Sequence, residues 1–318
     1  MTSKICVLGS YVCQMSVVLP HIPLPGETIV AQQFDMGQGG KGNNVAVAIR
    51  RLGVDVVLVE KIGKDIFGDM ALESYIREGI NISHIKRTDQ SSSGIGLVYI
   101  HPSGENTAAY FPGANEYLSE QDIENAKDDL QSADMLYLQL EIPDAPILAA
   151  VATAKRAGLK IVLNPAPARE IPEGLLEQVD VLTPNQVEAF ALISEEYQED
   201  LTFSKIETVG QKLLELGPSE IFLTLGNSGA LYINKQGQSF YQPCLPVDVV
   251  DTVGAGDAFN AALCVALVEK LPPMEALFRA SVNGALTTTK LGVIDALPTI
   301  AEVNAYIKSH NTQLGNLE

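Results

Sequence analysis

Short apolar runs rich in β-branched residues alternate with helical patterns along most of the chain. The predicted strands are KICVLGS (4–10), VDVVLVEKIG (54–63), ADMLYLQLE (133–141), LKIVLNP (159–165), VDVLTPN (179–185) and EIFLTLG (220–226). Helices are expected at 43–53, 65–79, 143–157, 185–194, 254–270 and 274–289, with a hairpin at 229–243. Strands that alternate with helices of about 10–15 residues indicate βαβ units, so the predicted fold class is α/β with a mostly parallel sheet.

Polar residues lie at the ends of four of these predicted strands. They are Glu141, Asn164, Asn185 and Thr224. In open parallel sheets, ligands bind beyond the carboxyl ends of the strands. These side chains therefore mark the edge of the sheet at which a binding site is expected.

Two segments break the alternation of strand and helix. GETIVAQQFDM (26–36) and GIGLVYIHPSGENTAAYF (94–111) alternate apolar and polar residues and contain hairpin turn signals. They predict a small accessory sheet inserted into the α/β domain. One face of such a sheet lacks a partner, so the sheet should cover a site or pair with a second copy of itself.

Size and charge narrow the classes of function. The 318 residues fit one large α/β domain or two average ones. Against 21 Lys and Arg there are 39 Asp and Glu, a net charge of −18. This charge argues against non-specific binding to nucleic acid or to anionic membranes, although a locally positive site could still take a polyanionic substrate. No apolar stretch approaches the roughly 18 residues of a membrane span.

The cysteines and the N-terminal residues predict a cytoplasmic protein. Cys6, Cys13, Cys244 and Cys264 are scattered, with no CxxC pair. They are typical of small core residues in a reducing compartment. The N-terminal residues start a strand pattern at once and show no apolar leader with a cleavage site.

The first glycine-rich loop is MGQGGKGNN (36–44). Gly37, Gly39 and Gly42 match the spacing of a dinucleotide fingerprint, and Glu60 lies 18 residues further on. We reject that interpretation because the preceding segment alternates like an edge strand, whereas the fingerprint follows a buried parallel strand. A Walker A loop also fails, since Lys41 is followed by glycine. Four glycines in six residues suggest close approach of a hydroxyl-rich ligand, with the Asn44 amide nearby.

The second loop is VDTVGAGDAFNAAL (250–263). Gly254, Ala255 and Gly256 should expose backbone N–H groups at a helix N-terminus, which favours an anion. Asp257 follows in the first turn. A stabilising first-turn carboxylate, worth about 0.3–1 kcal/mol, would explain Asp257 but not the three small residues before it. An anion hole beside a carboxylate suits phosphoryl transfer to a hydroxyl. The helix dipole is expected to lower the pKa of Asp257.

Five motifs occur together in one order along the chain. They are GGKGNN (39–44), LNPAPARE (163–170), TPNQVEA (183–189), TLGNSG (224–229) and DTVGAGDAF (251–259). Together they resemble the ribokinase family, also called the PfkB carbohydrate kinases. The resemblance implies a single three-layer α/β/α domain over 1–318, with a β-sheet lid from about 13–37 and 94–112. It also implies a kinase that uses ATP to phosphorylate a sugar-type hydroxyl.

The resemblance assigns roles to residues of this chain. Asp257 is the expected catalytic base, with Gly254, Ala255 and Gly256 as the anion hole. The expected sugar-contacting residues are Val12, Gln14, Gly39, Gly40, Lys41, Asn44, Glu141 and Asp257. The expected nucleotide-binding residues are Asn185, Thr224, Leu225, Gly226, Asn227, Ser228, Gly229, Gly256 and Ser281. The expected partners are ATP, a small sugar-type substrate and a second copy joined through the lid, with no nucleic acid and no membrane.

Two ion sites are also expected. Asn185 and Glu188 should hold Mg²⁺ through water. Their i, i+3 spacing puts them on one helix face and their oxygens suit a hard cation, but a capping Asn with a surface Glu is an alternative explanation. By resemblance, a monovalent cation, K⁺, is expected at Asp251, Val253, Thr287, Lys290 and Gly292.

The chain departs from the family after its first strand. Members that phosphorylate ribose carry GSxNxD there, whereas this chain has Val12 and Gln14 in place of the Asn and Asp. A carboxylate accepts two hydroxyl protons, and a neutral amide holds a diol less strongly. The sequence thus predicts poor use of ribose. A nucleoside, a hexose or its derivative, and a sugar-binding regulator without catalysis remain alternatives.

Overall fold

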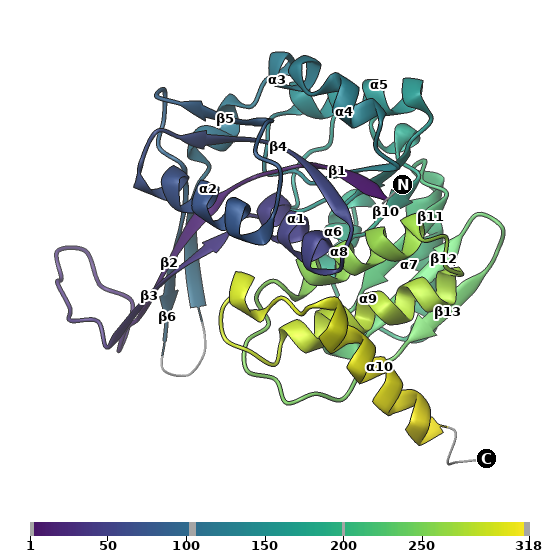
Figure 1. Cartoon of the computed structure of the whole chain (residues 1–318). Coiled ribbons are helices and arrows are strands. Elements are labelled where there is room, and N and C mark those ends of the chain that lie inside the picture. Colours follow the sequence, from purple (N-terminus) through teal and green to yellow (C-terminus); the bar gives the residue numbers. More distant parts are fainter. Residues whose placement is uncertain (1–2, 102–105, 199–200, 315–318) are drawn as a thin grey trace.

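The main sheet of the computed structural model has nine strands and runs through the centre of the molecule (Figure 1). The structure describes residues 3–101, 106–198 and 201–314. The strand order is β13-β12-β11-β10-β9-β8-β1-β4-β5, in which β12 pairs antiparallel with both β11 and β13 and the other neighbours pair in parallel. The strands are β1 (Lys4–Leu8), β4 (Asp55–Gly63), β5 (Ile85–Thr88), β8 (Met135–Leu138), β9 (Lys160–Leu163), β10 (Val181–Leu182), β11 (Glu220–Thr224), β12 (Ala230–Asn234) and β13 (Ser239–Gln242).

Helices cover both faces of this sheet. One apolar layer packs under α1 (Lys41–Arg51), α2 (Ile66–Glu78), α8 (Ala255–Val268), α9 (Pro273–Thr287) and α10 (Ile300–Leu314). The other packs under α3 (Glu120–Asn125), α4 (Lys127–Gln131), α5 (Asp144–Ala157), α6 (Gln186–Leu192) and α7 (Phe203–Glu215). Within β1, Ile5 and Val7 join the first layer and Cys6 and Leu8 the second, as the alternation of a strand requires. This is the expected three-layer α/β/α fold.

A four-stranded sheet stands to one side of the main sheet (Figure 1). Its order is β3-β2-β6-β7, from β2 (Val12–Val18), β3 (Gln33–Gly39), β6 (Gly94–Ile100) and β7 (Asn106–Phe111). The accessory sheet is confirmed, but the prediction of a strand over 26–36 was wrong for 26–32. Those residues form a loop in which Glu27 accepts hydrogen bonds from Leu24 N and contacts the His21 ring, so local contacts replace strand pairing. The hairpin turn expected within 94–111 lies partly outside the described residues.

The small sheet joins the main domain at a crossing of three chain segments. The Asn115 side chain accepts a hydrogen bond from Tyr11 N at 3.0 Å and donates to the carbonyls of Tyr11 and Pro112 at 2.9 Å each. Gly40, with φ 97°, crosses the same region, and a Cβ there would collide with the Ser10 carbonyl. The small sheet is thereby fixed beside the carboxyl end of β1.

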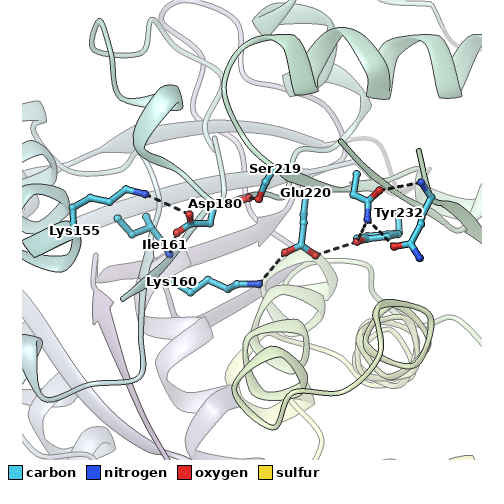
Figure 2. Close-up of polar contacts among 9 residues, drawn as sticks. Lys155, Lys160, Ile161, Asp180, Ser219, Glu220 and Tyr232 are labelled. Carbon is cyan, nitrogen blue, oxygen red and sulfur yellow. Dashed lines mark hydrogen bonds and ion pairs between the residues drawn. The ribbon is translucent and has the colours of Figure 1, made fainter. Parts of the chain in front are cut away.

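Charged residues clamp the opposite, amino-terminal edge of the main sheet (Figure 2). Asp180 accepts hydrogen bonds from Ile161 N at 2.8 Å and from Lys155 Nζ at 3.4 Å. Lys160 on β9 pairs with Glu220 on β11 at 2.8 Å. These side chains bond one another, so this edge is a structural one and the carboxyl edge is where candidate chemistry gathers.

Cysteine burial and helix lengths test two further expectations. Cys6, Cys13 and Cys264 are buried as expected, but Cys244 is exposed, so its assignment to the core was wrong. Cys244 lies just after β13, the edge strand of the main sheet. Among the described residues, no helix has the length and apolar character to cross a membrane.

Candidate active site

Five polar residues from four distant parts of the chain meet at the carboxyl edge. They are Asp257 on α8, Lys41 and Asn44 on α1, Glu188 on α6, and Glu141 after β8. Helices α1 and α8 pack together, and Asn44 Nδ2 donates to Asp257 Oδ2 at 2.7 Å. The structure therefore brings together the predicted base and four residues predicted to contact sugar or metal.

Glu141 is held by groups from two other segments. Its Oε2 accepts hydrogen bonds from the Ser10 hydroxyl at 2.7 Å and from Lys41 N at 2.9 Å. The same hydroxyl accepts a bond from Gly42 N at 3.2 Å. Sequence reasoning missed Ser10, although a serine just after the first strand, beside a glutamate after the neighbouring strand, is a usable signal.

The charges of the cluster shift one another. Burial lowers the pKa of Lys41, but the carboxylates of Asp257 and Glu141 outweigh it and the pKa is raised overall. Lys41 thus stays a cation inside the site. Burial also raises the pKa of Glu188, opposed by Asn185 N–H and by Lys41.

The expected lowering of the pKa of Asp257 was wrong. Burial dominates and raises the pKa of this carboxyl above its ordinary range, while Lys41 and the Asn44 hydrogen bond oppose the rise. The N-terminus of α8 favours the ionised carboxylate, whereas removal of the carboxyl group from water favours the neutral acid. For Asp257 the removal from water has the larger effect on the pKa. Asp257 is consequently a stronger base than a surface aspartate.

The N-terminus of α8 forms the loop beside Asp257. Gly254 caps the helix in the left-handed region with φ 82°, and a Cβ there would approach Val293 Cγ1 at 2.8 Å. A Cβ on Gly256 would meet nothing within 4 Å, so space lies open at this residue. Ala255 N donates to the Thr252 carbonyl at 3.3 Å. The expectation of three exposed amides was therefore wrong at Ala255, and the next two amides of the first turn are the candidates.

Asn185 and Glu188 form a capping box at the start of α6. Asn185 N and Nδ2 donate to the two Glu188 oxygens at 2.8 and 2.9 Å, and Glu188 N donates to Asn185 Oδ1 at 2.9 Å. The alternative of a capping Asn is thus correct, but Glu188 is buried and not a surface residue. In the part of the chain that the structure describes, no group of three His, Cys, Asp or Glu side chains could hold a metal by itself.

The glycines of the first loop have a structural cause. A Cβ on Gly40 or Gly42 would collide with the backbone of Gly9 and Ser10. Ligand approach is therefore not needed to explain these two, and our interpretation of the four glycines was too broad. The rejection of a dinucleotide fingerprint is confirmed, because the loop follows an accessory-sheet strand and Glu60 is fully buried against Tyr75.

Strand register places two long side chains on one face of the small sheet. Gly37, Gln14, Gly96 and Tyr110 are direct partners across the four strands and so share a face. Burial raises the pKa of Tyr110 and the charge of Glu141 raises it further, so Tyr110 lies within electrostatic range of Glu141. Val12 is on it too, with Cγ1 3.3 Å from where a Cβ on Gly96 would be. Tyr110 was missed because only the register reveals its direction.

The predicted nucleotide residues lie in a compact turn next to α6. β11 ends at Thr224, which pairs with Asn185, and a 3₁₀ turn follows at Gly226–Ser228. Gly229 has φ 99°, and the Tyr241 hydroxyl donates to the Ser228 carbonyl. Ser281 lies on α9, where its hydroxyl donates to the Leu277 carbonyl at 2.9 Å.

Three of the residues predicted for a monovalent cation are joined by hydrogen bonds just before α8. Asp251 accepts hydrogen bonds from Val253 N at 3.0 Å and Gly292 N at 3.1 Å. Asp251 N donates to the Thr288 carbonyl at 3.1 Å. The loop that leads into α8 is therefore tied to the end of α9, which includes Thr287 and leads into Lys290.

A buried carboxylate at a helix N-terminus, beside a half-buried lysine and at the carboxyl edge of an α/β/α sheet, indicates a phosphotransferase that acts on a hydroxyl. Residues 2–300 match the pfkB family carbohydrate kinases, and the chain belongs to this family. It is accordingly a carbohydrate kinase.

Similar proteins cover nearly the whole chain. The Haemophilus influenzae ribokinase is 32% identical over 308 residues, covering 97% of this chain and 99% of that protein. The Salmonella typhimurium deoxyribokinase is 32% identical over 304 residues, with 95% and 98% covered. The structure of Arabidopsis thaliana ribokinase complexed with ribose and ATP has a TM-score of 0.88 at 28% identity, with 96% and 98% covered. The kinase fold predicted from the motifs is confirmed.

Proposed function

We propose that the protein transfers the γ-phosphoryl group of ATP to a sugar hydroxyl, with Asp257 as the base. The observation that carries this is the buried Asp257 carboxylate, held by Asn44 at 2.7 Å in the first turn of α8. Ribokinases and a deoxyribokinase among the relatives support a sugar acceptor.

Asp257 takes the proton of the attacking hydroxyl in this proposal. Its raised pKa favours that step, since a base works best when its pKa approaches the working pH. The amides of Gly256 and Asp257 bind the oxygens of the transferred group, and half-buried Lys41 offsets negative charge. The transition state is loose, so position and charge contribute more than basicity alone.

The sugar lies between Glu141, Asn44 and the loop Gly39–Lys41 on one side and the small sheet on the other. That sheet acts as a lid, with Val12, Gln14 and Tyr110 facing the acceptor. Val12 offers an apolar edge and Gln14 a neutral amide. An acceptor with fewer hydroxyls than ribose fits this pair, and a deoxyribokinase is among the relatives. A nucleoside or a hexose derivative is the second candidate.

ATP would lie along the Thr224–Gly229 turn, with Ser281 near the adenine. Asn185 and Glu188 would hold Mg²⁺ through water, which suits a carboxylate whose oxygens already accept protein hydrogen bonds. K⁺ would be held by Asp251 with the carbonyls of Val253, Thr287, Lys290 and Gly292. It would orient the loop before α8.

The outer face of the lid supports a homodimer. Met36, Phe34 and Leu97 share the face opposite Gln14 and are 41%, 61% and 39% exposed. An apolar sheet face with open edges is stabilised when a second copy covers it. We place this dimer in the cytoplasm, as the free cysteines favour.

A coupled ADP-release assay tests the proposal. The purified chain is given ATP, Mg²⁺ and a panel of D-ribose, 2-deoxy-D-ribose, hexoses and nucleosides. At least one acceptor should raise ADP release more than tenfold over ATP alone. No stimulation by any member of the panel would contradict the proposed function.

A further inference from the structure

A buried glutamic acid with no role in the proposed reaction lies at the end of β4. Glu60 is 0% exposed. The Tyr75 hydroxyl on α2 donates to its Oε2 at 2.6 Å. Its Oε1 has no hydrogen-bond partner among the residues that the structure describes. A carboxyl group in this setting is costly as an anion and tolerable as a neutral acid.

Glu60 packs directly against the segment that follows β1. A Cβ on Gly9 would lie 2.9 Å from Glu60 Oε1 and 2.6 Å from Leu58 Cδ1. Only glycine therefore lets the Glu60 side chain fill this space. Gly9 N in turn donates to the Val59 carbonyl at 2.8 Å, which fixes the segment above β4.

The next residue of that segment belongs to the sugar site. The Ser10 hydroxyl donates to Glu141 at 2.7 Å and accepts from Gly42 N at 3.2 Å, and the Ser10 carbonyl accepts from Asn43 N at 3.1 Å. A shift of Gly9 would move Ser10 and with it the Glu141 carboxylate. Glu60 thus packs against Gly9, the residue just before Ser10, whose contacts arrange the acceptor side of the site.

We propose that Glu60 is a positioning residue that must be an uncharged acid: it supports the Gly9–Tyr11 segment from below, and its ionisation in alkaline solution releases that segment and weakens acceptor binding. The ionised carboxylate would keep a single hydrogen bond in a dry site. Water would then have to enter between β4 and Gly9. Asp257 lies on α8, which is not part of the Gly9–Tyr11 segment. The weaker acceptor binding should therefore appear in KM more than in kcat.

Among the residues that the structure describes, no cation is paired with Glu60 to compensate its ionised carboxylate. Burial raises the pKa values of Tyr75, Tyr11 and Cys13, which are neutral near pH 8. Burial also acts on Asp65, but hydrogen bonds from Gly68 and Ser93 lower the pKa of that carboxyl overall and it stays anionic.

The adjacent residue Lys61 pairs with Asp122 at 2.6 Å. Burial raises the pKa of Glu60 to about 8, opposed by the Tyr75 hydrogen bond.

Stability has a matching pH dependence. A carboxyl whose pKa is near 8 in the folded state and about 4.3 in the unfolded chain holds its proton more tightly when folded. The folded state therefore loses stability as pH rises from about 4.3 to about 8, and the loss is complete above that. Glu60→Gln can accept the Tyr75 hydrogen bond but does not ionise. The thermal unfolding midpoint of Glu60→Gln minus that of the wild type should increase from pH 5 to pH 8.5.

The kinetic arm rests on the proposed function and uses the acceptor from the panel that works best, with ATP and Mg²⁺. From pH 6.5 to 9.5, kcat/KM of the wild type should fall about tenfold per unit above pH 8, mainly through KM. Glu60→Gln should lack this fall of kcat/KM above pH 8, the alkaline limb of the pH profile. Tyr75→Phe removes a bond that lowers the pKa of Glu60, so its limb should move to higher pH.

Hydrogen exchange tests the positioning role without catalysis. At pH 9, peptides that cover residues 9–14 should exchange faster in the wild type than in Glu60→Gln, and at pH 6.5 they should match. Any of three results would overturn the proposal. They are equal hydrogen exchange of wild type and Glu60→Gln at pH 9, a difference in unfolding midpoint that does not change with pH, and a fall of kcat/KM above pH 8 that persists in Glu60→Gln. If no acceptor is phosphorylated, the proposed function fails, and hydrogen exchange with the midpoints still decides the role of Glu60.

Discussion

Replacing Asp257 with asparagine separates its chemistry from its packing. The amide of Asp257→Asn keeps an oxygen that can accept the Asn44 hydrogen bond, which is 2.7 Å long in the structure. It cannot accept the proton of an attacking hydroxyl. We expect kcat to fall by roughly 10²–10⁴-fold, or about 3–5 kcal/mol on the barrier. KM for the acceptor should change much less.

The same substitution should not destabilise the fold. Burial raises the pKa of Asp257, so its ionised form costs stability at neutral pH and the neutral amide removes that cost. Lys41 still has the carboxylates of Glu141 and Glu188 nearby. The unfolding midpoint at pH 7.5 should therefore equal or exceed that of the wild type.

Steady-state kinetics and thermal unfolding are compared for wild type, Asp257→Asn and the control Asp248→Asn. Asp248 is an exposed aspartate nine residues upstream, and its change should leave kcat within a factor of two. A kcat for Asp257→Asn within threefold of wild type would refute its role as the base. A large drop in its unfolding midpoint would refute the account of its burial.

Four further outcomes are expected. Lys41→Met removes a charge that lowers the pKa of Asp257, so the acid limb of kcat/KM should move to higher pH, and an unshifted limb would contradict this. Activity should need Mg²⁺ and rise with K⁺, and Asp251→Asn should abolish the K⁺ effect; equal rates in Tris and K⁺ buffers count against that cation site. Val12→Asn with Gln14→Asp should improve kcat/KM for D-ribose tenfold or more, at about 1–3 kcal/mol per regained contact, whereas a wild type with a micromolar KM for ribose would show this reasoning to be wrong. Phe34→Lys should turn a dimer into a monomer in light scattering at micromolar concentration, and a monomeric wild type would disprove the dimer.

The local signals in the sequence were sufficient for the main layers of the fold. Helix α2 ends at Gly79 in the left-handed region, as its pattern predicts, and the hairpin of β12 and β13 is where expected. Helix α7 was not predicted, although Ile206, Val209 and Leu213 recur at helical spacing. The sequence analysis also missed strand β5 and helices α3, α4 and α10, because they are short or lie in segments that the strand pattern did not cover.

Pairing between distant segments limited the rest. The strand β10 has only two residues instead of the predicted seven, although on either side of it Asp180 N still donates to the Ile161 carbonyl and Thr183 N to the Leu163 carbonyl. Tyr110 and Ser10 face the site only because of strand register and chain crossing, which no local pattern encodes. The motifs located Asp257 and Lys41, but the sign of the Asp257 pKa shift depends on burial by the whole fold.

Direct observation of the product tests the central claim most directly. The wild-type chain is incubated with ATP, Mg²⁺ and its best acceptor, and phosphorus NMR follows the reaction. The account predicts a sugar phosphomonoester formed in equal amount with ADP, and its near absence with Asp257→Asn. Release of inorganic phosphate alone, or binding of the sugar without any phosphorylated product, would contradict it.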